Sequence, residues 1–201
     1  MANNKAERDQ DAQELEVLHV EDKRGAPEPL NVESTMAGTG KQPIDLYTIG
    51  EHLEFTDARE QAGGRRSEGV VTLAAGKDGP GAHIHTQQIE GFEVLSGTLV
   101  VIVDGQTTRL EAAPMVARFW YEPALNMEWM LQTMGERAMA RGGAWKNVPL
   151  LVAAYMLFMM RKEYRLGGMP FWLQDVLFGL LAGVAVITGQ AKKVPHIPGK
   201  L

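Results

Sequence analysis

The chain has 201 residues, 45% of them hydrophobic and 22% charged, proportions that suit one globular domain with additions. The net charge of −5, without a basic stripe interleaved with aromatic residues, argues against a nucleic-acid partner. Cysteine is absent, which excludes disulfides and thiolate metal sites. The N-terminus lacks the apolar core of a secretory signal, so we expect a cytoplasmic protein that is not secreted.

Residues 1–44 are polar, charged and interrupted by glycine and proline. A segment this poor in large apolar residues buries too little surface to offset its ordering entropy. We therefore expect it to be a disordered leader; an interaction tail is the alternative.

Residues 45–125 contain short runs of valine, leucine, isoleucine, threonine and aromatic residues, separated by turn residues. Strands are expected at 53–55, 69–74, 91–95, 98–103, 107–110 and 116–121. Asp104-Gly105 between two of these runs is a strong hairpin signal, because both turn residues must take positive φ. Short strands at this spacing predict an antiparallel sandwich or barrel.

From residue 126 to 190 the apolar period becomes helical. Asn126 is placed as a helix N-cap, and Met130, Met134 and Ala138 line one face before Gly142-Gly143 stops the helix. Two more helices are expected at 149–160 and 171–189, each with a proline at or just before its start. The charged stretch 161–170 between them reads as a linker, and 191–201 as a tail.

The residues best suited to chemistry are His83, His85 and Glu90. Two histidines two residues apart face the same side of an extended backbone. If the chain reverses near residues 86–89, Glu90 on the returning strand approaches both. Two imidazoles and one carboxylate suit Fe(II), and also Mn, Ni, Zn or Cu.

These residues resemble the first motif of the cupin superfamily, whose pattern is His-x-His, three or four residues, Glu, six residues, Gly. The segment from His83 through Glu90 to Gly97 fits that pattern. The resemblance implies a mainly β fold, a cupin jelly roll or partial β-barrel, here followed by C-terminal α-helices. It also implies a divalent metal held by His83, His85 and Glu90, and a small-molecule ligand in the barrel.

The second cupin motif, whose histidine supplies a fourth ligand, is missing after Leu110. The resemblance therefore implies that about two strands are lost between Leu110 and Val116, which leaves three protein ligands and an opened barrel. The exposed edges then need cover from a helix, a partner chain or a membrane. A homodimer paired through these edges is a mild expectation.

Other polar and aromatic residues near the motif are given ordinary roles. Gln87 and Gln88 fall in the expected turn, where solvation is expected; a place at the pocket mouth is the alternative. Glu93 lies three residues beyond Glu90, so strand alternation sends it to the opposite, solvated face. The aromatic run 119–121 is assigned to the core, with a ligand-stacking wall as the alternative.

Residues 171–189 are apolar apart from Gln174, Asp175 and one threonine, and their length can cross a bilayer. The two polar residues near the start would be costly in lipid. A spanning helix, an interfacial hairpin and a buried helical pair therefore stay open.

Two functions follow from the sequence. The first is a cupin protein that binds a divalent metal, a small molecule or both; if it is an enzyme, its chemistry is metal-dependent and oxygenase- or isomerase-like. The second is a non-catalytic protein with a degenerate barrel that associates with a membrane or a partner.

Overall fold

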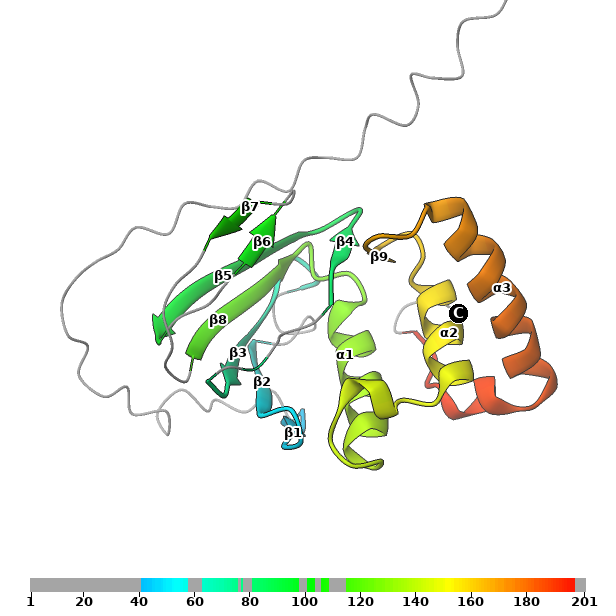
Figure 1. Cartoon of the computed structure of the whole chain (residues 1–201), viewed down its shortest axis with the longest axis horizontal. Coiled ribbons are helices and arrows are strands. Elements are labelled where there is room, and N and C mark those ends of the chain that lie inside the picture. The colour runs from blue at the N-terminus through cyan, green and yellow to red at the C-terminus, as the bar shows by residue number, and fades with distance from the viewer. Residues whose placement is uncertain are drawn as a thin grey trace, which may run out of the picture.

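A computed structural model describes residues 41–57, 63–75, 77, 81–97, 101–103, 106–108 and 115–197 (Figure 1). Most of the segment 1–44, expected to be a disordered leader, lies outside these residues. The first described element is strand β1 (Ile44–Leu46), whose two apolar side chains are fully buried.

The main sheet has five antiparallel strands in the order β1-β2-β3-β8-β5. Its other strands are β2 (Glu51–Asp57), β3 (Ser67–Leu73), β5 (Ile89–Ser96) and β8 (Met115–Glu122). Burial alternates strictly along β8, where Met115, Ala117, Phe119 and Tyr121 are buried, as expected for a sheet with one face on the core. These strands confirm the expected mainly β architecture.

Two small sheets complete the strands. β6 (Val101–Val103) pairs with β7 (Gln106–Thr108), with Val103 opposite Gln106, which agrees with the expected hairpin although residues 104–105 are outside the described chain. β4 (His83–His85) pairs with β9 (Tyr164–Leu166), a strand that lies about 80 residues further along the sequence.

Three α-helices follow the sheet as the sequence predicts: α1 (Met127–Met139), α2 (Leu150–Met159) and α3 (Phe171–Ile187). Short 3₁₀ turns lie at η2 (Trp145–Asn147) and at η3 (Gln190–Lys193), which begins at the last residue of the expected helical segment and runs into the expected tail. Figure 1 shows α1 beside the sheet, α2 beyond it and α3 outermost. Among the described residues, no helix is both long and apolar enough to cross a membrane.

Strands and helices share one hydrophobic core. Its buried members come from the inner face of the sheet, from α1 and α2, and from residues just before and after α2: Ile44, Leu46, Leu53, Phe55, Phe119, Tyr121, Met127, Met130, Ala138, Val148, Val152, Met156 and Met160. The chain's own helices therefore cover the apolar inner face of the sheet. Burial of this shared apolar surface is the main force that holds the extension on the sheet.

Buried polar contacts fix the helices on the sheet. The indole of Trp145 donates a 2.8 Å hydrogen bond to Glu51 on β2, and the hydroxyl of Ser67 on β3 donates a 3.0 Å bond to Glu128 on α1. Burial raises the pKa of Glu51, and the bond from Trp145 opposes that rise. Such satisfied buried groups set the register of the helices more sharply than apolar contact alone does.

The expected linker 161–170 is wrong in part, because its residues 164–166 form β9. The charged residues of this segment suggest a solvated loop. A strand of only three residues is stabilised by pairing with another strand rather than by its own β-propensity, so the local sequence does not indicate it. Two further backbone bonds flank the pair: Thr86 N–H donates to the carbonyl of Glu163 and Gly167 N–H to that of Ala82.

The same segment caps α1. Asn126 occupies the expected N-cap position, but its side chain makes no capping bond. Instead the buried carboxylate of Glu163 accepts a 3.0 Å bond from the Asn126 backbone N–H and a 2.6 Å bond from its side-chain amide. The cap of α1 is thus a tertiary contact that no local pattern encodes.

Replacing Glu163 with alanine is expected to destabilise the fold by about 2–3 kcal/mol, because charge-assisted bonds are lost and two buried donors remain. Urea unfolding measures the change, with Glu136→Ala on the exposed side of α1 as the control. Glu163→Gln, which keeps one acceptor, should lose less than Glu163→Ala. A loss for Glu163→Ala below about 0.5 kcal/mol, the range of surface substitutions, would contradict this role.

Candidate metal centre

Strands β4 and β5 bring together the three residues that the sequence predicts as metal ligands. His83 and His85 project from β4, and Glu90 projects from β5 after the chain reverses. Glu90 Oε2 lies 3.2 Å from Nε2 of His83 and 3.4 Å from Nε2 of His85. One ligand atom of each residue lies within 4.8 Å of the other two, so the cluster could hold a metal ion.

The cluster is largely withdrawn from solvent. The side chains of His83, His85 and Glu90 are 15%, 1% and 10% exposed. Nε2 of His85 is buried and makes no aligned hydrogen bond to any described residue. A buried ring nitrogen that is left without a partner costs free energy, and a metal ion is one group that would satisfy it.

The outer nitrogens of both imidazoles face oxygen acceptors. Nδ1 of His83 lies 2.8 Å from the carbonyl of Gly81, and Nδ1 of His85 lies 3.4 Å from Oε1 of Gln88. Since a carbonyl oxygen only accepts, each Nδ1 carries a proton there. In the neutral ring this leaves the lone pair on Nε2, the atom that faces Glu90.

Gln88 is held so that its oxygen points to His85. Its side-chain amide nitrogen donates to the carbonyls of Pro123, at 2.9 Å, and Ala124, at 2.8 Å. Both N–H groups are therefore used, and Oε1 is the atom left for the imidazole. The expectation that Gln88 is a solvated turn residue is wrong, since its side chain is buried and orients a candidate ligand.

Two tyrosines enclose the cluster. The ring of Tyr164, from β9, stacks on His83 with centroids 5.1 Å apart and meets His85 edge-on at 5.6 Å. Tyr121, opposite Glu90 in the β5–β8 ladder, lies 5.4 Å from the His85 ring, and its phenol is hydrogen-bonded to Glu90. Phe119 and Tyr121 of the aromatic run are core residues, as expected, and Tyr121 also contacts the candidate ligand His85.

The charges of the cluster stabilise one another. Burial opposes the Glu90 carboxylate, but the hydrogen bond from His83 and the charge interactions with the two adjacent imidazoles outweigh it and lower its pKa from 4.5 to about 2. For His83 burial opposes the charged ring, and the bond and charge of Glu90 outweigh it and raise its pKa. Without a metal, each of the two groups therefore favours the charged form of the other.

The tyrosines stay protonated around this pair. Burial, followed by the charge of Glu90, raises the pKa of Tyr164 from 10.0 to about 12. Burial and then the charge and hydrogen bond of Glu90 raise the pKa of Tyr121 as well. Both phenols are therefore neutral hydrogen-bond donors near neutral pH.

Other predicted residues lie outside the cluster. Glu93 is exposed and forms a 2.8 Å ion pair with Arg118 on β8, as its predicted outward orientation requires. The motif glycine, Gly97, follows β5 with φ of 71°, a conformation that favours glycine. No local pattern marks Tyr164 as a residue of the site, because its three-residue strand lies within the expected linker.

Residues 69–113 match the model of the family described as the cupin domain. The match contains His83, His85, Glu90 and Gly97 and ends before β8. This portion of the chain is therefore a cupin domain, as the motif implied. A search of curated proteins found no match.

Replacing Glu90 with glutamine in chelator-treated protein is expected to lower the His83 pKa below its ordinary value of 6.5, because burial then acts without the opposing carboxylate. The His83 ring protons, followed by NMR across pH 4–9, report this change. The ion pair stabilises the fold below about pH 6.5, and that contribution is lost as pH rises through the higher folded pKa. Glu93→Gln on the opposite face is the matched control, and an equal His83 pKa in both variants would contradict the assignment.

Proposed function

We propose that this cupin domain binds one divalent transition-metal ion through His83, His85 and Glu90, and that the metal-loaded pocket receives a small molecule. The observation that carries the proposal is the convergence of three ligand atoms within 4.8 Å. Both histidines present Nε2 inward while Nδ1 is held by an oxygen acceptor. That arrangement fixes the tautomer that a metal requires.

The donor set narrows the choice of metal. Two imidazoles and one carboxylate are the ligands of non-haem Fe(II) sites, and Mn, Ni, Zn and Cu also accept them. When bound, such an ion supplies Lewis-acid chemistry and, for the redox-active metals, one-electron chemistry. Three protein ligands leave coordination positions for water or a small molecule. We therefore favour a metal-dependent enzyme of oxygenase- or isomerase-like chemistry over simple metal storage.

The chain's own residues would orient the ligands and exclude water. Gln88 and the Gly81 carbonyl hold the two rings, and the phenol of Tyr121 holds the Glu90 carboxylate. Tyr164 covers the outer side of His83. Metal binding would remove the proton from Nε2 of His83, so affinity should fall as pH drops.

The direct test is the metal content of purified protein beside that of the His83→Ala, His85→Ala double variant. We expect about one metal ion per chain in the wild type and a large loss in the variant, because two of three ligands are removed. Each candidate metal ion is added back to the purified protein before elemental analysis. A site that was empty only because the metal was scarce during expression will then fill, whereas a site without affinity will stay empty. Equal metal content in both proteins after reconstitution would end the proposal.

Replacing Gln88 with leucine should weaken metal binding by about 10–100-fold, since His85 loses the acceptor that fixes its ring. Competition against a chromogenic chelator measures the affinity. Gln87→Leu is the matched control, because Gln87 precedes Gln88 in the same turn and its side chain is exposed. If both variants kept wild-type affinity, Gln88 would have only a packing role.

The alternative, a non-catalytic protein that associates with a membrane or a partner, is favoured by a separate observation. Helix α3 exposes most of its large apolar side chains. This exposed surface does not involve His83, His85 or Glu90, so it is compatible with a cluster that binds a metal and with one that does not. The homodimer expected from strand edges stays a prediction.

A further inference from the structure

Helix α3 carries bulky apolar side chains on the side that faces away from the protein. Their spacing of four, four, four and three residues places them on one helix face. The least exposed of them is 45% exposed and the most exposed is 86%. We call this set the α3 outer stripe: Trp172, Val176, Leu180, Val184 and Ile187.

The inward side of α3 has the opposite character. Its buried residues are Gln174, Ala182 and Ala185, and Gly179 lies against the ring of Phe158 on α2. A helix on a water-facing surface normally places its large apolar residues inward and its polar residues outward. Single exposed apolar residues are common, but a contiguous apolar stripe marks a surface that contacts something else.

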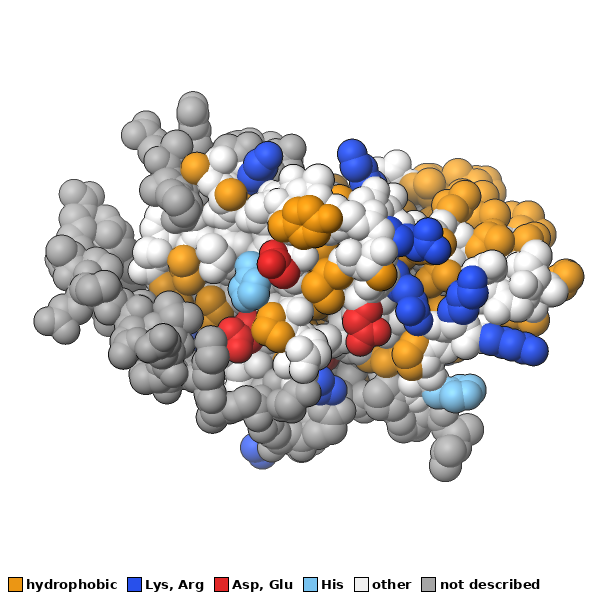
Figure 2. Space-filling model, turned by 90° about the horizontal axis from the view of Figure 1, so that it is seen from below, with side chains coloured by type: hydrophobic (Ala, Val, Ile, Leu, Met, Phe, Trp, Pro, Cys, Tyr) orange, Lys and Arg blue, Asp and Glu red, His pale blue; other side chains and the backbone are white. Residues whose placement is uncertain are grey.

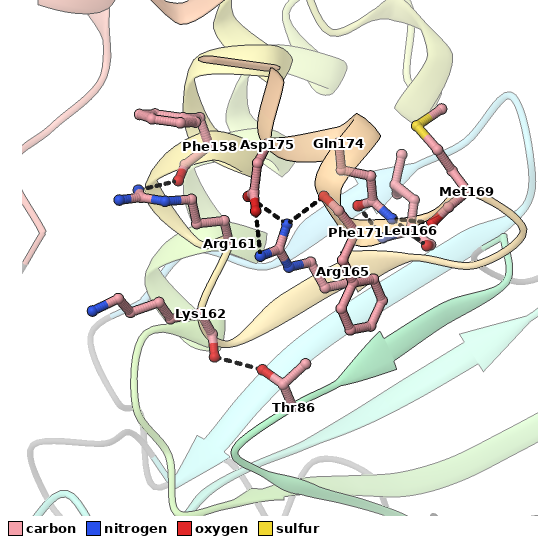
Figure 3. Close-up of polar contacts among 10 residues, drawn as sticks. All are labelled: Thr86, Phe158, Arg161, Lys162, Arg165, Leu166, Met169, Phe171, Gln174 and Asp175. Carbon is pink, nitrogen blue, oxygen red and sulfur yellow. Dashed lines mark hydrogen bonds and ion pairs between the residues drawn. The ribbon is translucent and has the colours of Figure 1, made fainter. Parts of the chain in front are cut away.

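Polar contacts at its start fix α3 in this orientation (Figure 3). The Gln174 amide accepts from Leu166 N–H at 3.0 Å and donates to the carbonyls of Leu166 and Met169, both at 2.8 Å. Arg165 forms an ion pair with Asp175 at 2.7 Å. The outer stripe is therefore a preformed surface, and Asp175, the acidic residue of α3, is paired with a basic side chain.

The charge around the outer stripe differs in sign from the charge of the remaining chain. Residues 141–201 hold eight Lys or Arg and two Asp or Glu, a net charge of +6. Residues 1–140 hold twelve Lys or Arg and twenty-three Asp or Glu, a net charge of −11. Arg161 and Lys162 precede α3, with Arg161 over the Phe158 ring, and Lys192 and Lys193 follow it. Figure 2 shows hydrophobic side chains gathered at this end of the molecule with basic side chains along their border.

We propose that the α3 outer stripe docks on an anionic phospholipid surface, with α3 lying in the plane of the interface. Apolar side chains would enter the acyl boundary while the basic residues at both ends meet the lipid phosphates. The proposal goes beyond metal binding and does not depend on it. Its support is the joint placement of an outward apolar stripe and a basic border.

A second copy of the chain fits the stripe less well. Both ends of α3 are basic, so parallel and antiparallel pairing of two stripes would each bring like charges together. A spanning position fits less well too, because 17 residues measure roughly 26 Å. In addition, α2 covers the inner side of α3, which leaves one face for the lipid.

The test uses the full chain with vesicles of phosphatidylcholine alone and of phosphatidylcholine with phosphatidylserine. Flotation should recover the protein with the phosphatidylserine vesicles, and added salt should weaken the binding. Tryptophan emission should shift to the blue on binding, because Trp172 leaves water. Trp172→Phe should remove most of that shift while the protein still binds the vesicles, because phenylalanine keeps a large apolar side chain at this position.

Two variants separate the apolar and the basic contributions. Val176→Ser with Leu180→Ser should lower partitioning by about tenfold or more, since two apolar side chains are removed. Lys192→Gln with Lys193→Gln should lower it by about thirtyfold on phosphatidylserine vesicles and little on phosphatidylcholine. Tyr47→Ser, at an exposed apolar residue near β1, is the matched control and should bind as the wild type does.

Several outcomes would overturn the proposal. One is failure of the wild type to bind phosphatidylserine vesicles in lipid excess. Another is equal binding by the wild type and by Val176→Ser with Leu180→Ser. A third is a wild-type dimer in solution that this variant dissociates, which would assign the stripe to a second copy. Circular dichroism and metal content of each variant confirm that the fold and the metal centre are retained.

Discussion

The pairing of β4 with β9 is the contact on which the rest of the molecule depends. β4 carries both histidines, and three residues of the helical extension form the only strand beside it within the described chain. Flanking backbone bonds from Thr86 and Gly167 lock the register. Because register decides which face each side chain occupies, this pairing fixes where His83 and His85 point. The extension is thus part of the site rather than an appendage.

The residues that enclose the site come from other parts of the chain than the second cupin motif. The second motif is missing, yet His83 and His85 are enclosed. Tyr164 arrives on β9 and covers His83, while Tyr121 holds Glu90 from β8. Both tyrosines are neutral donors, so the cluster has hydrogen-bonding groups beside it although the second motif's histidine is absent. The cluster is therefore largely withdrawn from solvent, because the two aromatic rings pack against the imidazoles.

Local patterns were enough for most of the architecture. Turn residues separated the strands, a 3.6-residue period located the helices, and the spacing of His83, His85 and Glu90 predicted the cluster. Two features depended on distant contacts and were missed. β9 is three residues long and charged, so its stability comes from its partner strand. Gln88 looks like a solvated turn residue, and only the carbonyls of Pro123 and Ala124, 35 and 36 residues away, bury it.

The orientation of α3 follows from the same segment. Turning the helix to bury its bulky side chains would move Gln174 outward and leave the Leu166 backbone groups and the Met169 carbonyl without their bonds. It would also separate Asp175 from Arg165. Unpaired buried polar groups cost about 1–3 kcal/mol each, which competes with the gain from burying a large apolar side chain. The chain therefore keeps its apolar stripe outward through the contacts of α3 with residues 165–169. Because β9 belongs to this segment and also pairs with β4, the same segment positions both the metal-ligand cluster and the outer surface of α3.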